Sequence, residues 1–265
     1  MQDPIDLLAA YDAQLRDDAE TPSALTVTRL GPLRLVTFSR GRGFVTYRDL
    51  GGADEVGLRE LVAGARRHFE AEPEIRHIEW KSRGHDRAPG LHEALLTQGF
   101  VPEETESIMV GEARLLVHDV PLPDGVTIRT IDSPQDVTRM CVMQAEVFGD
   151  HDAEPMIEAL LRRLARRDGM TLWVAEREDE LITAGRLEPV PGTAFAGIWG
   201  GATRPAWRGR GVYRALTAAR ARAALALGKT LIHSDSTEYS RPILEASGLV
   251  KVSTTTPYVW RRPLD

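Results

Sequence analysis

The stretch Ile198–Leu227 reads IWGGATRPAWRGRGVYRALTAARARAALAL and contains three kinds of segment in a row. An apolar run that includes two glycines ends at Thr203, and a loop rich in arginine and glycine extends to Gly211. From Val212 onward, apolar residues recur at intervals of three and four, which predicts an amphipathic helix. The stretch therefore predicts a strand, a loop and a helix in direct succession.

The loop and the start of the predicted helix have the properties of an anion-binding site. The first N–H groups of a helix have no acceptor within it, and the helix dipole is positive at that end. Gly209 and Gly211 permit a close backbone approach or a positive φ. Guanidinium groups from Arg204, Arg208 and Arg210 add charge that suits phosphate. We predict that this loop holds the diphosphate of a cofactor.

Two nucleotide-binding motifs match the sequence poorly. The segment Gly209-x-Gly211-x-x-Arg214 lacks the third glycine of the dinucleotide fingerprint. Gly228–Thr230 looks like the end of a Walker loop, but Ala223 stands where its first glycine is required. A predicted helix, rather than a strand, also precedes that segment. Neither motif is therefore assigned.

What remains is the run Arg208-Gly209-Arg210-Gly211-Val212, with Pro205 before it and Leu216 after it. This run resembles motif A of the GNAT N-acetyltransferase superfamily, whose pattern is Arg/Gln-x-x-Gly-x-Gly/Ala. The resemblance implies that backbone amides of the loop hold the pyrophosphate of acetyl-coenzyme A (acetyl-CoA), the acyl donor. The sequence departs from the pattern at Tyr213, where the family usually has glycine or alanine.

The resemblance also implies which residues contact the donor. The pyrophosphate is expected at Arg208, Gly209, Arg210, Gly211, Val212 and Tyr213. The pantetheine arm is expected along the strand before the loop, at Ala202 and Thr203. The paired glycines Gly200 and Gly201 predict a bulge that splays this strand from its neighbour.

Composition limits the kind of protein. The chain has 265 residues, enough for one large or two small domains, and 42% of them are hydrophobic, enough for a core. A formal net charge of −6 argues against a general nucleic-acid binder. The single cysteine, Cys141, excludes an internal disulfide and is expected to be a buried thiol. Without a membrane-spanning run or a signal peptide, we expect a cytoplasmic protein, monomeric or homodimeric.

The fold expected from the resemblance is the GNAT fold, an α/β fold with a mixed sheet. Residues 126–262 predict strands and helices in the order β-α-α-β-β-β-α-β-α-β, which matches that fold. Residues 94–101 parallel residues 243–250, which predicts a degenerate GNAT-like copy in the first half. We therefore expect an N-terminal domain at 1–111, a linker at 112–125 and a complete acetyltransferase domain at 126–265.

The first copy has carboxylates where the second has arginines. The segment Asp49–Glu55 precedes a predicted helix, and its acidic side chains stabilise a helix start but repel phosphate. We predict that the N-terminal copy binds no coenzyme, packs on the other copy and forms a wall of the acceptor site.

The reaction implied by the resemblance is direct attack of a neutral amine on the acetyl thioester. The family's usual general acid is a tyrosine in the last short helix, and Leu244 occupies that position here. Tyr239 and Tyr258 are the remaining candidates for the acid. A coenzyme thiol has a pKa near 8.5 and leaves passably without one. The acceptor implied by the family is a primary amine of a small molecule or peptide.

The general base is open. Glu188 ends a predicted strand beside the expected acceptor site and is our candidate, with Asp235 and Glu238 as alternatives. Each of these carboxylates is also consistent with an ordinary solvated side chain, and His233 is also consistent with a structural role in its strand. Trp199 and Trp207 are candidates for lining the donor channel.

The remaining clusters favour no further chemistry. The His-Asp pairs have no metal-ligand spacing, so no metal site is assigned. The basic group Arg162, Arg163, Arg166 and Arg167 is expected to form a solvated face with ion pairs. Two alternatives to an acetyltransferase stay open: an acyl-CoA sensor without catalysis, and a nucleotide-binding protein of another class.

Overall fold

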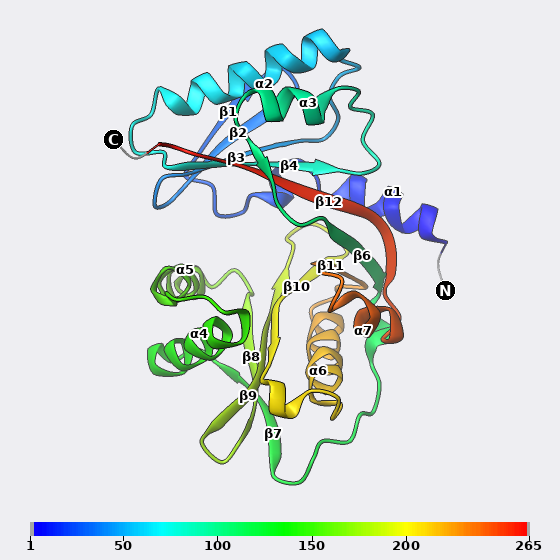
Figure 1. Ribbon diagram of the computed structural model, residues 1–265. Helices are drawn as coiled ribbons and strands as arrows, with labels where there is room; N and C mark the ends of the chain where they lie inside the picture. Colours follow the sequence, from blue (N-terminus) through cyan, green and yellow to red (C-terminus); the bar gives the residue numbers. More distant parts are fainter. Residues whose placement is uncertain (1–2, 264–265) are drawn as a thin grey trace. The chain divides into compact units, whose positions relative to one another are not determined.

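The computed structural model describes residues 3–263, which divide into two compact units (Figure 1). The C-terminal unit consists mainly of Met109–Asp235 and Tyr239–Val250. The N-terminal unit consists of Leu8–Ile108, Ser236–Glu238 and the segment from Lys251 onward. Each unit has its own buried apolar core.

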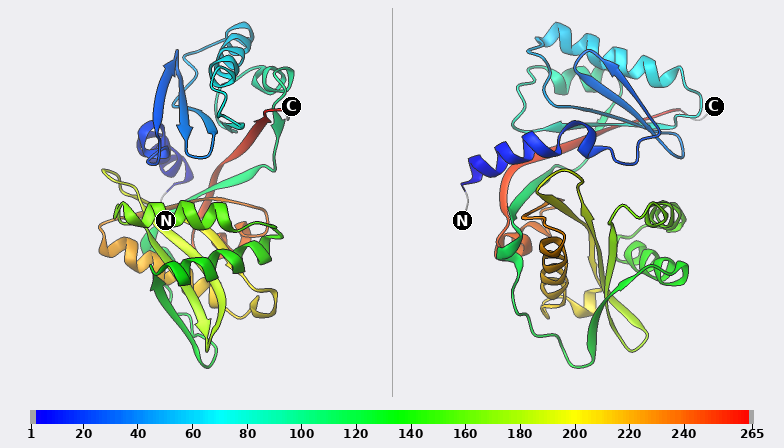
Figure 2. Two further views of the ribbon diagram at one scale, coloured as in Figure 1. Left: turned by 90° about the vertical axis from the view of Figure 1, so that its left-hand side faces the viewer. Right: turned by 180° about the vertical axis from the view of Figure 1, so that it is seen from behind.

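The C-terminal unit is a sheet with helices on both faces (Figures 1 and 2). Its strands follow the order β11-β10-β9-β8-β7, and only β10 and β11 are parallel. The strands are β7 (Val126–Ile131), β8 (Thr171–Arg177), β9 (Glu180–Pro189), β10 (Phe195–Thr203) and β11 (Leu231–Ser236). The helices are α4 (Pro134–Phe148) and α5 (Glu154–Ala165) on one face, α6 (Val212–Ala226) on the other, and α7 (Arg241–Ala246).

Local sequence accounts for several of these elements. The Ser133 side chain accepts a hydrogen bond from the Asp136 amide at 3.1 Å, and Pro134 occupies the first turn of α4, as predicted. The hairpin of β8 and β9 also lies where the sequence predicts it. Cys141 is buried in α4, and burial raises the pKa of its thiol to about 11, so it is a core residue.

The N-terminal unit repeats part of this arrangement. Its strands are β1 (Thr26–Leu30), β2 (Leu33–Phe38), β3 (Arg42–Tyr47), β4 (His77–Arg83), β5 (Val101–Pro102) and β12 (Val250–Arg261). Helices α2 (Glu55–Glu70) and α3 (Leu91–Thr97) pack on the sheet, and α1 (Pro4–Leu15) opens the chain. The parallel pair β3–β4 is joined by α2, just as β10–β11 is joined by α6. This correspondence agrees with two related copies.

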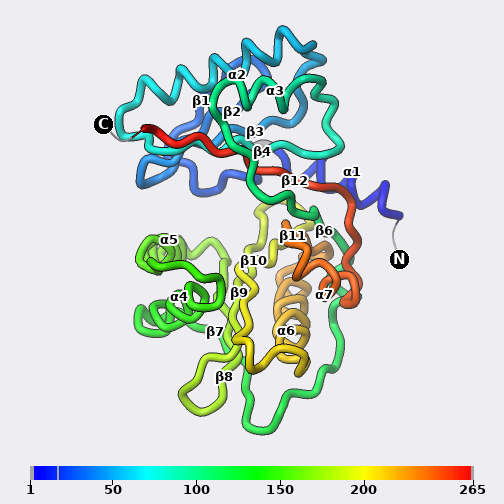
Figure 3. The backbone as a smooth tube through the Cα atoms, in the orientation of Figure 1, coloured from blue at the N-terminus to red at the C-terminus, as the bar shows by residue number. Residues whose placement is uncertain are grey.

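The final strand of the chain, β12, and the strand that connects the two units do not follow the predicted domain boundaries. Residues Thr255–Arg261 of β12 pair with His77–Arg83 of β4, so the chain's final strand belongs to the N-terminal unit (Figure 3). Conversely, β6 (Glu106–Glu112) passes from the N-terminal unit into the C-terminal one, where Met109 packs against Ile232. The expected boundaries at 111 and 126 therefore differ from those of the compact units, because alternation along a strand does not specify its partner.

Charged side chains fill the N-terminal unit where β3 and β4 stop pairing, after Val45 and Trp80. The buried Glu20 carboxylate accepts hydrogen bonds from Thr46 on β3 and Arg83 on β4, and it lies 3.2 Å from Lys81 Nζ. Burial alone raises the pKa of Glu20, but the charges of Arg83 and Lys81 outweigh it and lower the pKa to about 2.

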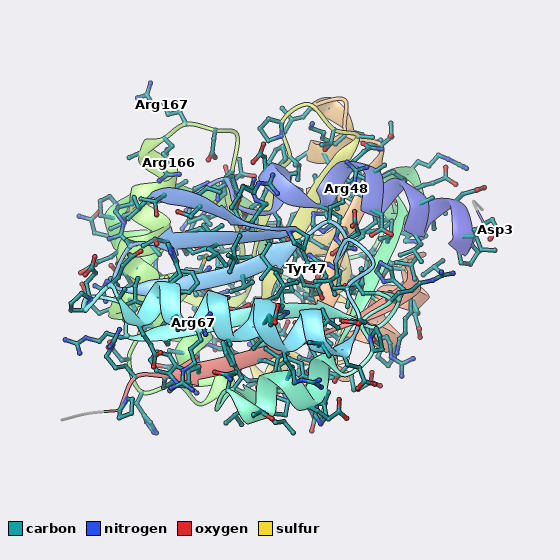
Figure 4. All side chains as sticks on the ribbon, turned by 90° about the horizontal axis from the view of Figure 1, so that it is seen from above. Asp3, Tyr47, Arg48, Arg67, Arg166 and Arg167 are labelled. Carbon is teal, nitrogen blue, oxygen red and sulfur yellow. The ribbon has the colours of Figure 1, made fainter. Side chains whose placement is uncertain are left out.

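A third cation, Arg16, lies near the end of β3. Arg16 donates hydrogen bonds from Nε and Nη2 to the carbonyl of Tyr47, at 3.1 and 2.9 Å. Tyr47 is the last residue of β3 and is labelled in Figure 4. The ends of both strands are therefore held by charged groups of the chain itself.

Glu20→Gln is expected to destabilise the protein by about 3 kcal/mol, because it leaves the buried Arg83 and the half-buried Lys81 without their carboxylate. The pKa of Glu20 is lower in the folded state, so its contribution is full above the unfolded pKa of about 4.3 and is lost as the pH falls toward 2. Urea unfolding between pH 7 and pH 3 measures this. A variant as stable as the parent at pH 7 would contradict it.

Candidate functional site

The site is built where two parallel strands separate. Strand β10 pairs with β11 only from Phe195 to Gly197, opposite Leu231 to His233. β10 then continues to Thr203 and β11 to Ser236 without pairing further with each other. One side chain reaches across the start of the gap, since the Ser234 hydroxyl donates to the Ile198 carbonyl at 2.9 Å. The predicted splay is thus present, and the backbone of Gly201 is exposed beyond it.

A bulge bends β10 at the same level, as the sequence predicts. Trp199 pairs with Arg186 and Ala202 pairs with Ala184, so two residues of β10 oppose Gly185 of β9. These two residues are Gly200 and Gly201, and Gly200 has a φ of 61°. A Cβ on Gly201 would stand 2.6 Å from the Tyr213 hydroxyl. The bulge therefore requires small residues at this point.

Gln144 holds the bulge from the face covered by α4. Its Nε2 donates a hydrogen bond to the Gly200 carbonyl at 2.5 Å. The side chain is buried, so this amide is fixed in position. Sequence reasoning missed Gln144, because a glutamine within an amphipathic helix gives no sign of its partner.

The loop after β10 ends at an uncapped helix start. Gly209 and Gly211 have φ values of 74° and 80°, and Gly211 is the N-cap of α6. No side chain caps this end, and its first turn contains no acidic residue. The first hydrogen bond of the helix runs from the Ala215 amide to the Gly211 carbonyl at 2.9 Å. The amides from Val212 to Arg214 therefore have no acceptor within the helix.

The three loop arginines differ in their partners. Arg204 Nη1 lies 2.9 Å from Glu146 Oε2, and Arg204 Nε donates to the Leu181 carbonyl, so Arg204 supports the loop. Arg208 is exposed and donates only to the Thr203 carbonyl, at 3.2 Å. Arg210 lies over the Trp207 ring at 5.1 Å. Within residues 3–263, no carboxylate pairs with Arg208 or Arg210, so both charges are available to an anion.

The two tryptophans have different surroundings. Trp207 packs in a core cluster with Ile182 and Val212, and its Nε1 lies 3.3 Å from Glu180 Oε2. The prediction that Trp207 lines a channel is therefore wrong, because its ring anchors the loop to the sheet. Trp199 is half-buried at the bulge, with its ring edge-on to His233 at 5.1 Å.

The residues predicted to meet the pantetheine arm lie at the end of β10. Ala202 and Thr203 pair with Ala184 and Thr183 of β9. The Ala202 carbonyl accepts a hydrogen bond from Thr183 Oγ1 at 2.6 Å. The contact with the arm stays a prediction.

Of the candidate catalytic residues, Glu188 lies on β9 opposite Gly197 of β10. Its Oε1 is 2.6 Å from Arg186 Nε, and its Oε2 is 3.3 Å from Arg163 Nη1. Both carboxylate oxygens therefore contact a guanidinium. Glu188 is near the gap, but it is an ion-paired carboxylate rather than an isolated base.

The two tyrosines lie in different surroundings from Glu188. Tyr239 is 89% exposed, just before α7, and among residues 3–263 no hydrogen bond orients its hydroxyl. Tyr258 belongs to the N-terminal unit, where its hydroxyl lies 2.9 Å from His92 Nδ1 and burial raises its pKa. Leu244, at the position of the family's tyrosine, is buried in the core beside α6.

The basic group at the end of α5 forms ion pairs, as predicted. Arg162 contacts Glu158 at 3.3 Å, and Arg163 pairs with Asp168. Arg166 and Arg167 are exposed and project outward (Figure 4). In the part of the chain that the structure describes, no helix is long and apolar enough to cross a bilayer, and no acidic, histidine or cysteine cluster could hold a metal ion.

Comparisons with known proteins agree with this geometry. Residues 137–245 match the model of the acetyltransferase (GNAT) family. The fold is similar to a GCN5-related N-acetyltransferase from Kribbella flavida, with a TM-score of 0.69, 15% identity, and coverage of 98% of this chain and 96% of that one. A tandem GNAT protein from the clavulanic acid biosynthesis pathway gives a TM-score of 0.64 at 15% identity, over 90% and 83% of the two chains.

A third similar structure is a GCN5-related N-acetyltransferase from Sphaerobacter thermophilus, with a TM-score of 0.62 and 14% identity over 88% of this chain and 78% of that one. A sequence search of curated proteins found no match. Identities this low show a shared fold, and the family match covers the strands and helices that build the gap. Residues 137–245 therefore match the GNAT acetyltransferase family, within a chain that has the GNAT fold.

Proposed function

We propose that the C-terminal unit transfers an acetyl group from acetyl-CoA to a primary amine of a small molecule or peptide. The observation that carries this proposal is the gap between β10 and β11, which opens after Gly197 and His233 and leads to the uncapped start of α6. The pantetheine arm of acetyl-CoA is extended and carries a pyrophosphate at its end. Such a molecule fits a gap in which unpaired strand backbone leads to the unpaired amides of a helix start.

The donor is assigned to the loop and the strand before it. Amides from Gly209 to Tyr213 donate hydrogen bonds to the pyrophosphate oxygens, and the side chains of Arg208 and Arg210 add charge. The Val212 side chain is buried, so it anchors the helix while its amide faces the ligand. The pantetheine arm follows the β10 backbone through Gly201, Ala202 and Thr203.

The chemistry uses few side chains. The amine nitrogen bonds to the thioester carbon, the carbonyl electron pair moves to oxygen, and collapse breaks the carbon–sulfur bond. Glu188 is our candidate to receive the amine proton, and it must loosen its contacts with Arg186 or Arg163 to do so. No tyrosine is assigned as the acid, because Tyr239 is unoriented and Tyr258 bonds to His92.

The N-terminal unit is proposed to bind no coenzyme. The corresponding region, where β3 and β4 part, contains Glu20 bonded to Thr46 and Arg83, with Arg16 on the Tyr47 carbonyl. A coenzyme arm in that region would have to displace a buried ion pair. This agrees with the acidic segment before α2.

The alternative is an acyl-CoA sensor without catalysis. It is favoured by two observations, the buried Leu244 in place of a tyrosine and the ion pairs that occupy Glu188.

Thiol release from acetyl-CoA with a panel of primary amines distinguishes the two functions. We expect release that depends on at least one amine, together with calorimetric binding of coenzyme A in preference to ATP and NAD. Binding of coenzyme A without release for any amine would support the sensor. A preference for ATP would contradict both.

Arg208→Gln and Arg210→Gln are each expected to weaken coenzyme A binding about 5-fold, which corresponds to about 1 kcal/mol for one charged contact. Pantetheine, which lacks the pyrophosphate, is expected to bind all variants equally. Arg177→Gln removes an exposed charge at the end of β8 and is the matched control. Equal calorimetric Kd values for coenzyme A in all three variants would remove the pyrophosphate from this loop.

A further inference from the structure

Arg220 is a charged residue on α6 that is completely buried. Its Nη1 donates to the Arg186 carbonyl at 3.3 Å, and its Nη2 donates to Thr217 Oγ1 at 3.2 Å. Its Nε has no hydrogen-bond partner, and no carboxylate contacts the guanidinium among residues 3–263. Burial lowers the pKa of Arg220, the neighbouring Tyr213 offsets only part of this effect, and Arg186 lowers the pKa further. The protein thus contains a buried cation without a carboxylate partner among the described residues.

Fold stability does not account for this residue. Burying a charge without an opposite partner is costly, and a neutral side chain of similar volume is often as stable or more stable at such a position. The two hydrogen bonds to neutral acceptors offset only part of that cost. A residue of this kind is a candidate for a role in the reaction.

The guanidinium lies directly behind the β10 bulge. Gly185 is the β9 residue that opposes Gly200 and Gly201. A Cβ on Gly185 would stand 2.5 Å from Arg220 Nη1 and 3.4 Å from the Trp199 carbonyl oxygen. The Arg220 guanidinium can therefore approach β9 opposite the bulge only because Gly185 has no side chain.

Tyr213 lies next to Arg220 and also contacts the bulge. Its ring centroid is 5.8 Å from the Arg220 guanidinium carbon, and its hydroxyl abuts Gly201. Tyr213 is the residue that departs from the family's Gly/Ala pattern. The side chain therefore fills the space between α6 and the bulge, and Gln144 fixes Gly200 from the other face.

We infer that Arg220 is a positioning residue for acyl transfer, which fixes the β10 bulge and supplies positive charge behind it. This inference rests on the proposed function. When the amine attacks, negative charge develops on the thioester oxygen beside the β10 backbone, and it returns to the carbon–oxygen bond as the thiolate leaves. A fixed charge in a water-poor interior stabilises that intermediate more than the ground state.

The test compares Arg220→Met with Arg220→Lys. Arg220→Met is expected to fold with an unchanged or higher melting temperature and to bind acetyl-CoA with a Kd within 2-fold of the parent. Its kcat is expected to fall 10- to 100-fold. Arg220→Lys keeps the charge and is expected to recover most of the kcat. Arg222→Met, on the exposed side of the same helix, is the control and is expected to keep the parent kcat.

A second variant moves the cation without removing it. Gly185→Ala places a Cβ against the guanidinium and is expected to lower kcat in the same way. Because both changes act on one contact, the double variant with Arg220→Met is expected to be no slower than Arg220→Met alone.

A parent-like kcat in Arg220→Met would overturn the inference. So would equal losses in Arg220→Met and Arg220→Lys accompanied by a lower melting temperature, since that pattern indicates a purely structural residue. Absence of amine-dependent thiol release in the unmutated protein is a different result, because it refutes the proposed function itself.

Discussion

The separation of two parallel strands is the constraint on which the C-terminal unit depends. β10 and β11 would bury their backbone groups against each other if they paired to their ends. The bulge at Gly200 and Gly201 turns β10 away after three paired residues, and it leaves strand backbone without a partner. The uncapped start of α6 lies at the end of the same strand. A ligand that satisfies both sets of groups completes the hydrogen bonding that the fold leaves open.

The groups around the gap are locally unfavourable and are held by the surrounding core. The bulge, the uncapped helix and the unpaired Arg220 each cost free energy, and well-packed apolar clusters on both faces of the sheet offset that cost. Such a concentration of unsatisfied groups is typical of a functional site. The N-terminal unit has the same strand-helix-strand frame, yet Glu20 and Arg83 satisfy each other where its strands part. The two halves thus differ in chemistry more than in architecture.

Local patterns in the sequence were enough for most helices and strands, for the bulge in β10 and for the uncapped start of α6. Paired glycines predicted the bulge, and a loop with three arginines before an apolar repeat predicted the helix start. Long-range features were not predictable in this way. The pairing of β12 with β4 and the hydrogen bond from Arg220 to the Arg186 carbonyl join residues far apart in the chain. The role of Trp207 was not predictable for a related reason. A tryptophan side chain suits the wall of a ligand channel and a buried core equally well, and Trp207 lies in a core cluster.

The candidate catalytic residues show where sequence reasoning ends. The predicted strand put Glu188 near the gap. Its two arginine partners lie on β9 and α5, and the spacing of residues in the sequence does not reveal these ion pairs. Tyr258 was assigned to the wrong unit because its strand pairs with β4. Backbone sites follow from glycine and helix signals, whereas side-chain chemistry depends on the tertiary environment.

The most direct measurement of the central claim is the change in backbone amide chemical shifts of ¹⁵N-labelled protein on addition of acetyl-CoA. The account predicts that the largest changes fall on the amides of Gly209–Tyr213 and of Gly200–Thr203, with little change at Thr46 and Arg83. Saturation with the largest changes outside the gap between β10 and β11, or at the ends of β3 and β4, would contradict it.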